Sequence, residues 1–111
     1  FSAAKKIKDV NYLHFVSHEA LNLKIVAEQF TQNNLDAVAF LISTDKDKAT
    51  VLIKCSPKLK LDCSSVLKAC FPLINGKGGG KPDMAQGSGE NNSSMSKFIE
   101  SVEKLIFEKL S

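Results

Sequence analysis

Arginine is absent from this 111-residue sequence, so all 15 of its basic residues are lysines. A lysine ammonium is a point charge, which cannot grip a phosphate or a guanine with two parallel hydrogen bonds as arginine does. The net charge of +3 at pH 7 fits either a mildly basic surface or contact with nucleic acid. If nucleic acid is the partner, phosphate attraction should dominate and binding should weaken as salt rises.

Long apolar runs are missing as well. No stretch approaches the roughly 20 apolar residues of a membrane span, and we expect neither a membrane anchor nor a cleavable leader. The hydrophobic fraction of 43% and the charged fraction of 24% are typical of a globular protein of one domain. Because the sequence starts at Phe1 without a methionine, we expect it to be a fragment of a longer chain.

The three cysteines, Cys55, Cys63 and Cys70, form no C-x-x-C pair. An odd number without the spacing of a disulfide framework favours a reducing compartment. Cys70 falls at the apolar spacing of a helix, so we expect it in the core rather than in a metal site or as a nucleophile.

The spacing of apolar residues predicts an α/β fold, with a small mixed β-sheet covered by about three helices. The predicted order is strand, helix, strand, strand, helix, glycine loop, short strand, helix. The second strand is apolar on both faces, so it should be central, and it should form a hairpin with the third. The strands are predicted at 7–16, 35–44, 49–56 and 83–89, and the helices at 19–30, 64–71 and from Lys97 onward.

Short polar side chains mark the expected helix starts. Ser17 is predicted to cap the first helix, and Asp62 or Ser64 the second. The residue before a proline avoids helical geometry, so Pro72 should end or kink the second helix at Phe71.

No set of residues indicates catalysis. His14 and His18 are four residues apart, but no glutamate lies between them as in H-E-x-x-H. We therefore favour ordinary histidines, at a strand end and a helix start, over a metal pair. Asp45 and Asp47 read as turn residues, and no serine lies in a nucleophile elbow. We expect no catalytic site and no cofactor in this chain.

The most informative stretch is "GKGGGKPDMAQGSGE", residues 76–90, which holds all six glycines. It is not a Walker loop, because Lys81 is followed by Pro82 rather than by serine or threonine, and it lacks the last glycine of a dinucleotide fingerprint. Bare backbone can approach a ligand closely and bind anions through successive amides, and Lys77 and Lys81 add positive charge. A loop for anions or nucleic acid, a mobile loop and a tight packing turn all remain open.

This stretch resembles the glycine cluster followed by P-D-M-A-Q of the DHH-associated domain at the C-terminus of alanyl-tRNA synthetase. The match runs from Gly76 to Gly89, and the predicted order of elements extends the resemblance to nearly the whole chain. Two departures stand out. Lys81 replaces the commoner arginine, which removes a bidentate contact, and Gly87 and Ser88 replace alanine and glycine.

The resemblance implies a function as well as a fold. The parent enzyme would be a cytoplasmic alanine–tRNA ligase that uses ATP, with magnesium and zinc, in upstream aminoacylation and editing domains. The C-terminal module would bind the outer corner of tRNA(Ala), and the full-length enzyme would be able to self-associate while the fragment stays monomeric.

We therefore predict a nucleic-acid-binding site in the glycine stretch, made by Lys77, Gly78, Gly79, Gly80, Lys81 and Gln86. The lysines would neutralise phosphates, the glycines would allow close approach, and Gln86 would add a polar contact. Tyr12, Phe15 and Phe71 are candidates for stacking on bases, although each is more typical of a core position.

Two rival interpretations remain. The same domain accompanies DHH phosphoesterases, where it holds a substrate end near a metal site, but those typically carry G-G-G-H, and Lys81 stands where that histidine would be. The other rival is a self-association module in which the long final helix pairs with a neighbour.

Overall fold

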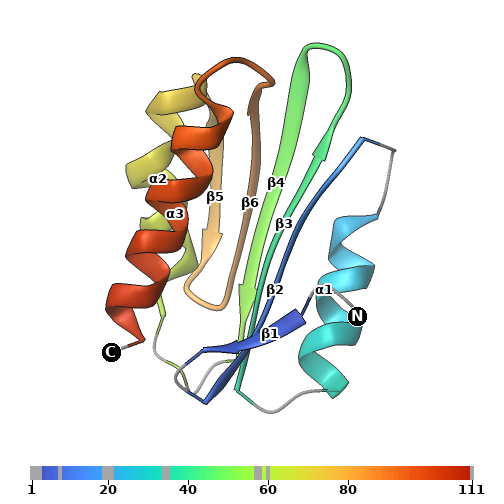
Figure 1. Cartoon of the computed structure of the whole chain (residues 1–111), viewed down its shortest axis with the longest axis vertical. Coiled ribbons are helices and arrows are strands. Elements are labelled where there is room, and N and C mark those ends of the chain that lie inside the picture. Colours follow the sequence, from blue (N-terminus) through green and yellow to red (C-terminus); the bar gives the residue numbers. More distant parts are fainter. Residues whose placement is uncertain are drawn as a thin grey trace.

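The computed structural model describes residues 4–7, 9–18, 22–33, 36–56, 59 and 61–110. They form one six-stranded sheet with helices on both faces (Figure 1). In chain order the elements are β1 (Ala4–Ile7), β2 (Val10–Ser17), α1 (Leu23–Asn33), β3 (Ala37–Thr44), β4 (Lys48–Cys55), α2 (Cys63–Cys70), the short 3-10 helix η2 (Phe71–Ile74), β5 (Lys77–Lys81), β6 (Met84–Glu90) and α3 (Met95–Lys109).

The strands lie in the order β1-β2-β3-β4-β6-β5. Neighbours are antiparallel except β2 and β3, which are parallel and are joined by the crossover through α1. Every residue of β3 except Ser43 is buried, because both of its faces are covered. The mixed sheet and the central, doubly buried strand are therefore confirmed.

The helices divide the apolar residues into two cores. Helices α2 and α3 cover one face of the sheet, and α1 covers the other (Figure 1). Phe40, Ile53 and Phe98 belong to the larger core on the α2/α3 side. Leu41 and Phe30 belong to the smaller core under α1. Alternate residues of β3 and β4 thus feed opposite cores, as a period of two requires.

The first predicted strand is two strands. β1 ends at Ile7, β2 begins at Val10, and the two pair antiparallel. Asp9 turns the chain between them with φ of 66°, a left-handed conformation that aspartate tolerates better than most residues. Loose alternation across 7–16 did not reveal this turn, because no glycine or proline marks it.

The predicted cap of the first helix is wrong. Ser17 is the last residue of β2, and α1 begins only at Leu23. The Asn22 side chain accepts a hydrogen bond from the Ile25 N–H at 3.2 Å, so asparagine caps the first turn. Glu19, at the predicted start of this helix, lies outside the described residues.

The later helices follow the prediction more closely. Asp62 caps α2 by accepting a hydrogen bond from the Ser65 N–H at 3.1 Å. Pro72 ends the α-helical geometry, and the chain continues as η2 until Asn75 takes up a left-handed conformation. Helix α3 starts at Met95, two residues before the predicted Lys97, and buries Phe98, Val102 and Ile106.

Candidate nucleic-acid interface

The glycine stretch is a strand and not the predicted loop. Residues 77–81 form β5, an edge strand that pairs antiparallel with β6. Pro82 and Asp83 make the turn between the two strands. Strand pairing uses only main-chain groups, so a segment almost without side chains can still complete a sheet when a partner strand is beside it.

All six predicted binding residues lie in this hairpin, in two facing rows. The strand β5 carries Lys77, Gly78, Gly79, Gly80 and Lys81. Gln86 lies on β6 directly opposite Gly79, and its side chain is exposed. The structure therefore brings together residues that are up to nine positions apart in the sequence.

Most of the glycines are required by close packing. A methyl group on Gly78 would collide with the main-chain carbonyl of Gln86, and one on Gly80 would lie 2.5 Å from the Met84 carbonyl oxygen. Cβ atoms essentially never come this close to other heavy atoms, so side chains are excluded on both sides of Gly79. Close packing therefore accounts for these glycines, although they lie in a strand and not in the tight packing turn that the sequence left open.

The helix side of the hairpin imposes the same requirement. A methyl group on Gly76 would lie 2.5 Å from a ring carbon of Phe71, and one on Gly89 would lie 2.6 Å from a side-chain carbon of Ile74. Both the aromatic and the aliphatic group come from η2, which packs directly against the two strands. These two glycines allow the hairpin to pack closely against the apolar side chains of η2.

Gly79 is the exception among the six glycines. A methyl group there would have Lys68 Cε at 3.4 Å and Ser64 Oγ at 3.9 Å as its nearest neighbours, which is ordinary van der Waals contact. Neither space nor backbone geometry demands glycine at this position, since no glycine of the chain has a positive φ. A ligand that approaches the strand closely is one reason for glycine here.

Three lysines surround this position. Lys77 and Lys81 bound β5 and are exposed, and Lys68 of α2 is exposed beside Gly79. Within the described part of the chain, none of the three has an ion-pair partner. Sequence reasoning missed Lys68. The signal was available, because Val66, Leu67 and Cys70 define the buried face of the helix and leave position 68 on the outside.

The edge position leaves main-chain groups free to meet a partner. Among the strands that the structure describes, β5 pairs with β6 alone. Alternate N–H and C=O groups of an edge strand point away from its neighbour and are available for pairing. Gly78 and Gly80 are exposed, so the lysines flank a stretch of accessible backbone.

The turn of the hairpin is held by residues of β4 and α2. The Cys55 N–H donates a hydrogen bond to the Asp83 carbonyl at 2.9 Å, and the Cys63 N–H donates one to the Pro82 carbonyl at 2.9 Å. These two bonds fix Lys81, the neighbouring residue, relative to the body of the domain.

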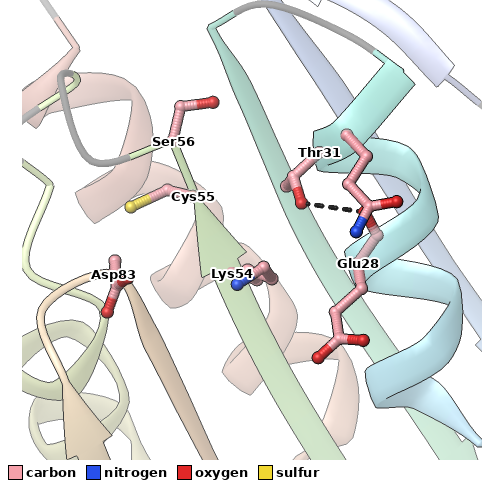
Figure 2. Close-up of a pocket in the computed structure, with 7 residues that line it drawn as sticks. Glu28, Thr31, Lys54, Cys55, Ser56 and Asp83 are labelled. Carbon is pink, nitrogen blue, oxygen red and sulfur yellow. Dashed lines mark hydrogen bonds between the residues drawn. The ribbon is translucent and has the colours of Figure 1, made fainter.

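A polar hollow of about 420 Å³ lies beside this turn. Figure 2 shows the Lys54 ammonium between Asp83 of the turn and Glu28 of α1, with Ser56 at the end of β4 above it. The Thr31 hydroxyl already donates hydrogen bonds within α1, to the carbonyls of Ala27 and Glu28. The hollow combines one cation with two carboxylates, so it adds no net positive charge to the interface.

The three aromatic residues that we considered for stacking on bases are buried or half-buried. Tyr12 and Phe71 are buried, exposing 1% and 3% of their surface, so stacking on bases is ruled out for both. The Tyr12 hydroxyl donates a hydrogen bond to the Glu103 carboxylate at 2.8 Å. Phe15 is half-buried and packs against the smaller core. Tyr12 and Phe15 point from β2 into the two cores and Phe71 packs from η2 into the larger one, so these aromatic residues stabilise the fold.

The two histidines are structural. His14 lies within β2, not at its end, and its Nδ1 atom is 2.8 Å from the Phe40 carbonyl oxygen. His18 follows the strand, and its Nδ1 atom is 2.8 Å from the Thr44 hydroxyl. Across the described ranges, no three His, Cys, Asp or Glu side chains are grouped so that they could hold a metal ion. Nor does any helix in those ranges have the length and apolar character to cross a membrane.

The fold and the hairpin define the class of protein. The chain belongs to the DHHA1 domain family, which matches residues 9–108. Among its relatives are the alanine–tRNA ligase of Leptospira biflexa, 32% identical over 100 residues, and that of Pseudothermotoga lettingae, 31% identical over 109 residues. These matches cover 87% and 92% of this chain but only 11% and 12% of the two ligases.

Solved structures share the fold. The C-Ala domain of Aquifex aeolicus alanyl-tRNA synthetase superposes with a TM-score of 0.81 at 22% identity, and the match covers 94% of this chain and 97% of that domain. A DHH-domain structure from a family of ribosomal proteins superposes with a TM-score of 0.66 at 13% identity. That match covers 96% of this chain and 28% of the other.

Proposed function

We propose that this domain is the C-terminal tRNA-binding module of an alanine–tRNA ligase, and that it binds the outer corner of tRNA(Ala) through the exposed edge of β5. The observation that carries the proposal is Gly79, a glycine that packing does not require, in an accessible strand surrounded by Lys68, Lys77 and Lys81. The similarity to bacterial alanine–tRNA ligases over most of the chain supports the choice of enzyme.

The chemistry of the interface follows from its residues. The three ammonium groups attract phosphates but read no sequence, since lysine offers rotatable donors without a fixed fork. The bare backbone between them lets an RNA strand approach more closely than a side chain would allow. Gln86 adds an amide that can donate to and accept from sugar or base edges. Recognition would thus depend on the shape of the RNA, which is the usual mode for folded RNA.

In the parent ligase this module would act at a distance from the chemistry. ATP-dependent aminoacylation and editing would take place in upstream domains in the cytoplasm, and the module would hold one tRNA for both. Tethering raises the effective concentration of a weak binding site. A modest affinity of the isolated domain would therefore be sufficient in the full enzyme.

A salt titration tests the interface. We expect Lys77→Ala combined with Lys81→Ala to weaken binding of a tRNA(Ala) transcript and to reduce the slope of log K against log salt by roughly 0.7–0.9 for each lost phosphate contact. Lys24→Ala is the matched control, because Lys24 is exposed on α1, which covers the other face of the sheet. An unchanged slope in the double variant would rule out both lysines as phosphate contacts.

A further inference from the structure

Two cysteines from different elements meet beneath the hairpin turn. Cys55 ends β4 and Cys63 begins α2, and their sulfur atoms are 3.5 Å apart. Both are free thiols and almost fully buried, exposing 2% and 0% of their surface. A disulfide holds its sulfurs about 2.05 Å apart, so an approach of about 1.5 Å would join them.

The two thiols differ in their surroundings. The Cys63 thiol donates its hydrogen bond to the Cys55 sulfur. The Cys55 sulfur lies 3.6 Å from the Leu61 carbonyl oxygen and 3.7 Å from that of Pro82. The hydrogen bond from Cys63 lowers the pKa of Cys55, and this effect exceeds the opposing effects of burial and of the Asp83 carboxylate. The bond it donates to Cys55 and its burial both raise the pKa of Cys63.

Only one residue of the pair borders the polar hollow. Cys55 lines the polar hollow beside Lys54, whereas Cys63 is not among the residues that line it. Figure 2 shows Cys55 next to Lys54 and Ser56 at the end of β4. The Cys55 side chain belongs to the core on the α2/α3 side of the sheet and points away from Glu28 and Thr31 (Figure 2), so a hydroperoxide reaches the two sulfurs only when the end of β4 opens locally.

We propose that Cys55 and Cys63 form a redox-active dithiol, which a hydroperoxide converts into a disulfide in the folded domain. The Cys55 sulfur attacks the peroxide oxygen, the O–O bond breaks and a sulfenic acid forms, while the departing oxygen takes up the Cys55 proton and leaves as water or an alcohol. The Cys63 sulfur then attacks the sulfenic sulfur, the S–S bond forms, and the sulfenic oxygen leaves as water with the Cys63 proton. Two electrons pass from the two thiols to the peroxide.

This disulfide would act as a clasp on the hairpin. The N–H groups of the same two cysteines already hold the Asp83 and Pro82 carbonyls. Linking the sulfurs would therefore tie the end of β4 to the start of α2 around the turn, and restrict the unfolded chain as well. The proposal concerns the redox chemistry of the domain and does not depend on RNA binding.

Oxidation of the native domain tests the proposal. After treatment with hydrogen peroxide and removal of excess reagent, we expect the titratable thiols in denaturant to fall from three to one. The intact mass should fall by two hydrogens, and protease mapping should link Cys55 to Cys63. The melting temperature should rise on oxidation and return to its initial value with dithiothreitol.

Two variants separate the roles of the sulfurs. Cys63→Ala should stop the reaction at a sulfenic acid on Cys55 that dimedone labels, and Cys70→Ala is the matched control that should still form the link. A link that forms only in denaturant, dimedone labelling of Cys70 first, or a lower melting temperature after oxidation would each overturn the proposal. The thiol count, the intact mass, the protease map and the melting temperature are all measured on the natural sequence, so they test the proposal even if a variant fails to fold.

Discussion

Gly79 of β5 faces Lys68 of α2, such that a methyl group on the glycine would touch the Lys68 side chain at 3.4 Å without a clash. On either side of it, Gly78 and Gly80 have no such room against the β6 backbone. The three consecutive glycines are therefore present for two different reasons. Gly78 and Gly80 are needed to form the hairpin, whereas Gly79 is available for a function of the hairpin.

The first prediction separates these requirements. Gly79→Ala should fold with a free energy of unfolding equal to that of the natural domain or up to about 1 kcal/mol higher, because alanine restricts the unfolded chain. Its affinity for the tRNA transcript should fall, because the methyl group would occupy the space beside the Lys68 side chain, where we expect the RNA strand to approach. Gly80→Ala should instead lower stability, as circular dichroism melting will show. Unchanged RNA binding by Gly79→Ala would exclude close approach at this residue.

The second prediction concerns Lys68, which only the structure identified. Lys68→Ala should leave the melting temperature nearly unchanged, since the side chain is exposed. It should lower the slope of log K against log salt by roughly 0.7–0.9 if Lys68 contacts one phosphate. Lys68→Arg should preserve the slope, because it keeps the charge. A slope that is equal in Lys68→Ala and the natural domain would remove Lys68 from the interface.

The third prediction uses Tyr12, the only tyrosine of the chain. Burial, followed by the hydrogen bond to Glu103, raises the pKa of Tyr12. A raised pKa contributes stability that is fully present below the unfolded value, near 10, and is lost as pH rises above it. Tyr12→Phe should cost about 1–2 kcal/mol at pH 7, and this difference should shrink above about pH 10.

Denaturant titrations at neutral and alkaline pH will measure the effect of Tyr12→Phe. In the natural domain the phenolate absorbance should appear together with alkaline unfolding. Phenolate absorbance that develops near pH 10 while the domain is still folded would show that the hydroxyl is not held as described.

The fourth prediction concerns the cap of α2. Hydrogen bonds from the Ser65 main chain and side chain lower the pKa of Asp62 below its ordinary value of 3.8. A lowered pKa contributes stability that is present above the unfolded value and is lost as pH falls through the folded value. Asp62→Asn should therefore melt lower than the natural domain at pH 7, and the gap should close under acid conditions. A gap that is independent of pH would show that the charge of Asp62 does not contribute.

Local sequence patterns predicted most of the elements. Strand 35–44, the hairpin that follows it and the cap at Asp62 depend on side-chain periodicity and on short-range hydrogen bonds, which residues close in sequence determine. The division of 7–16 at Asp9 and the delayed start of α1 at Leu23 were missed. Asp9 makes a turn without glycine or proline, which the pattern did not mark. Asn22 caps α1 at the position that the pattern had assigned to Ser17.

The sequence by itself determined that this is an α/β domain whose basic residues are all lysines, with a glycine-rich stretch of the DHH-associated type. Composition, periodicity and the P-D-M-A-Q run are properties of the chain alone. Only the tertiary structure decided that the stretch is an edge strand, that Lys68 stands beside Gly79, and that Cys55 meets Cys63. Those relationships depend on which strand and helix pack against β5 and β4. Packing between segments distant in the chain leaves no local pattern from which it could have been deduced.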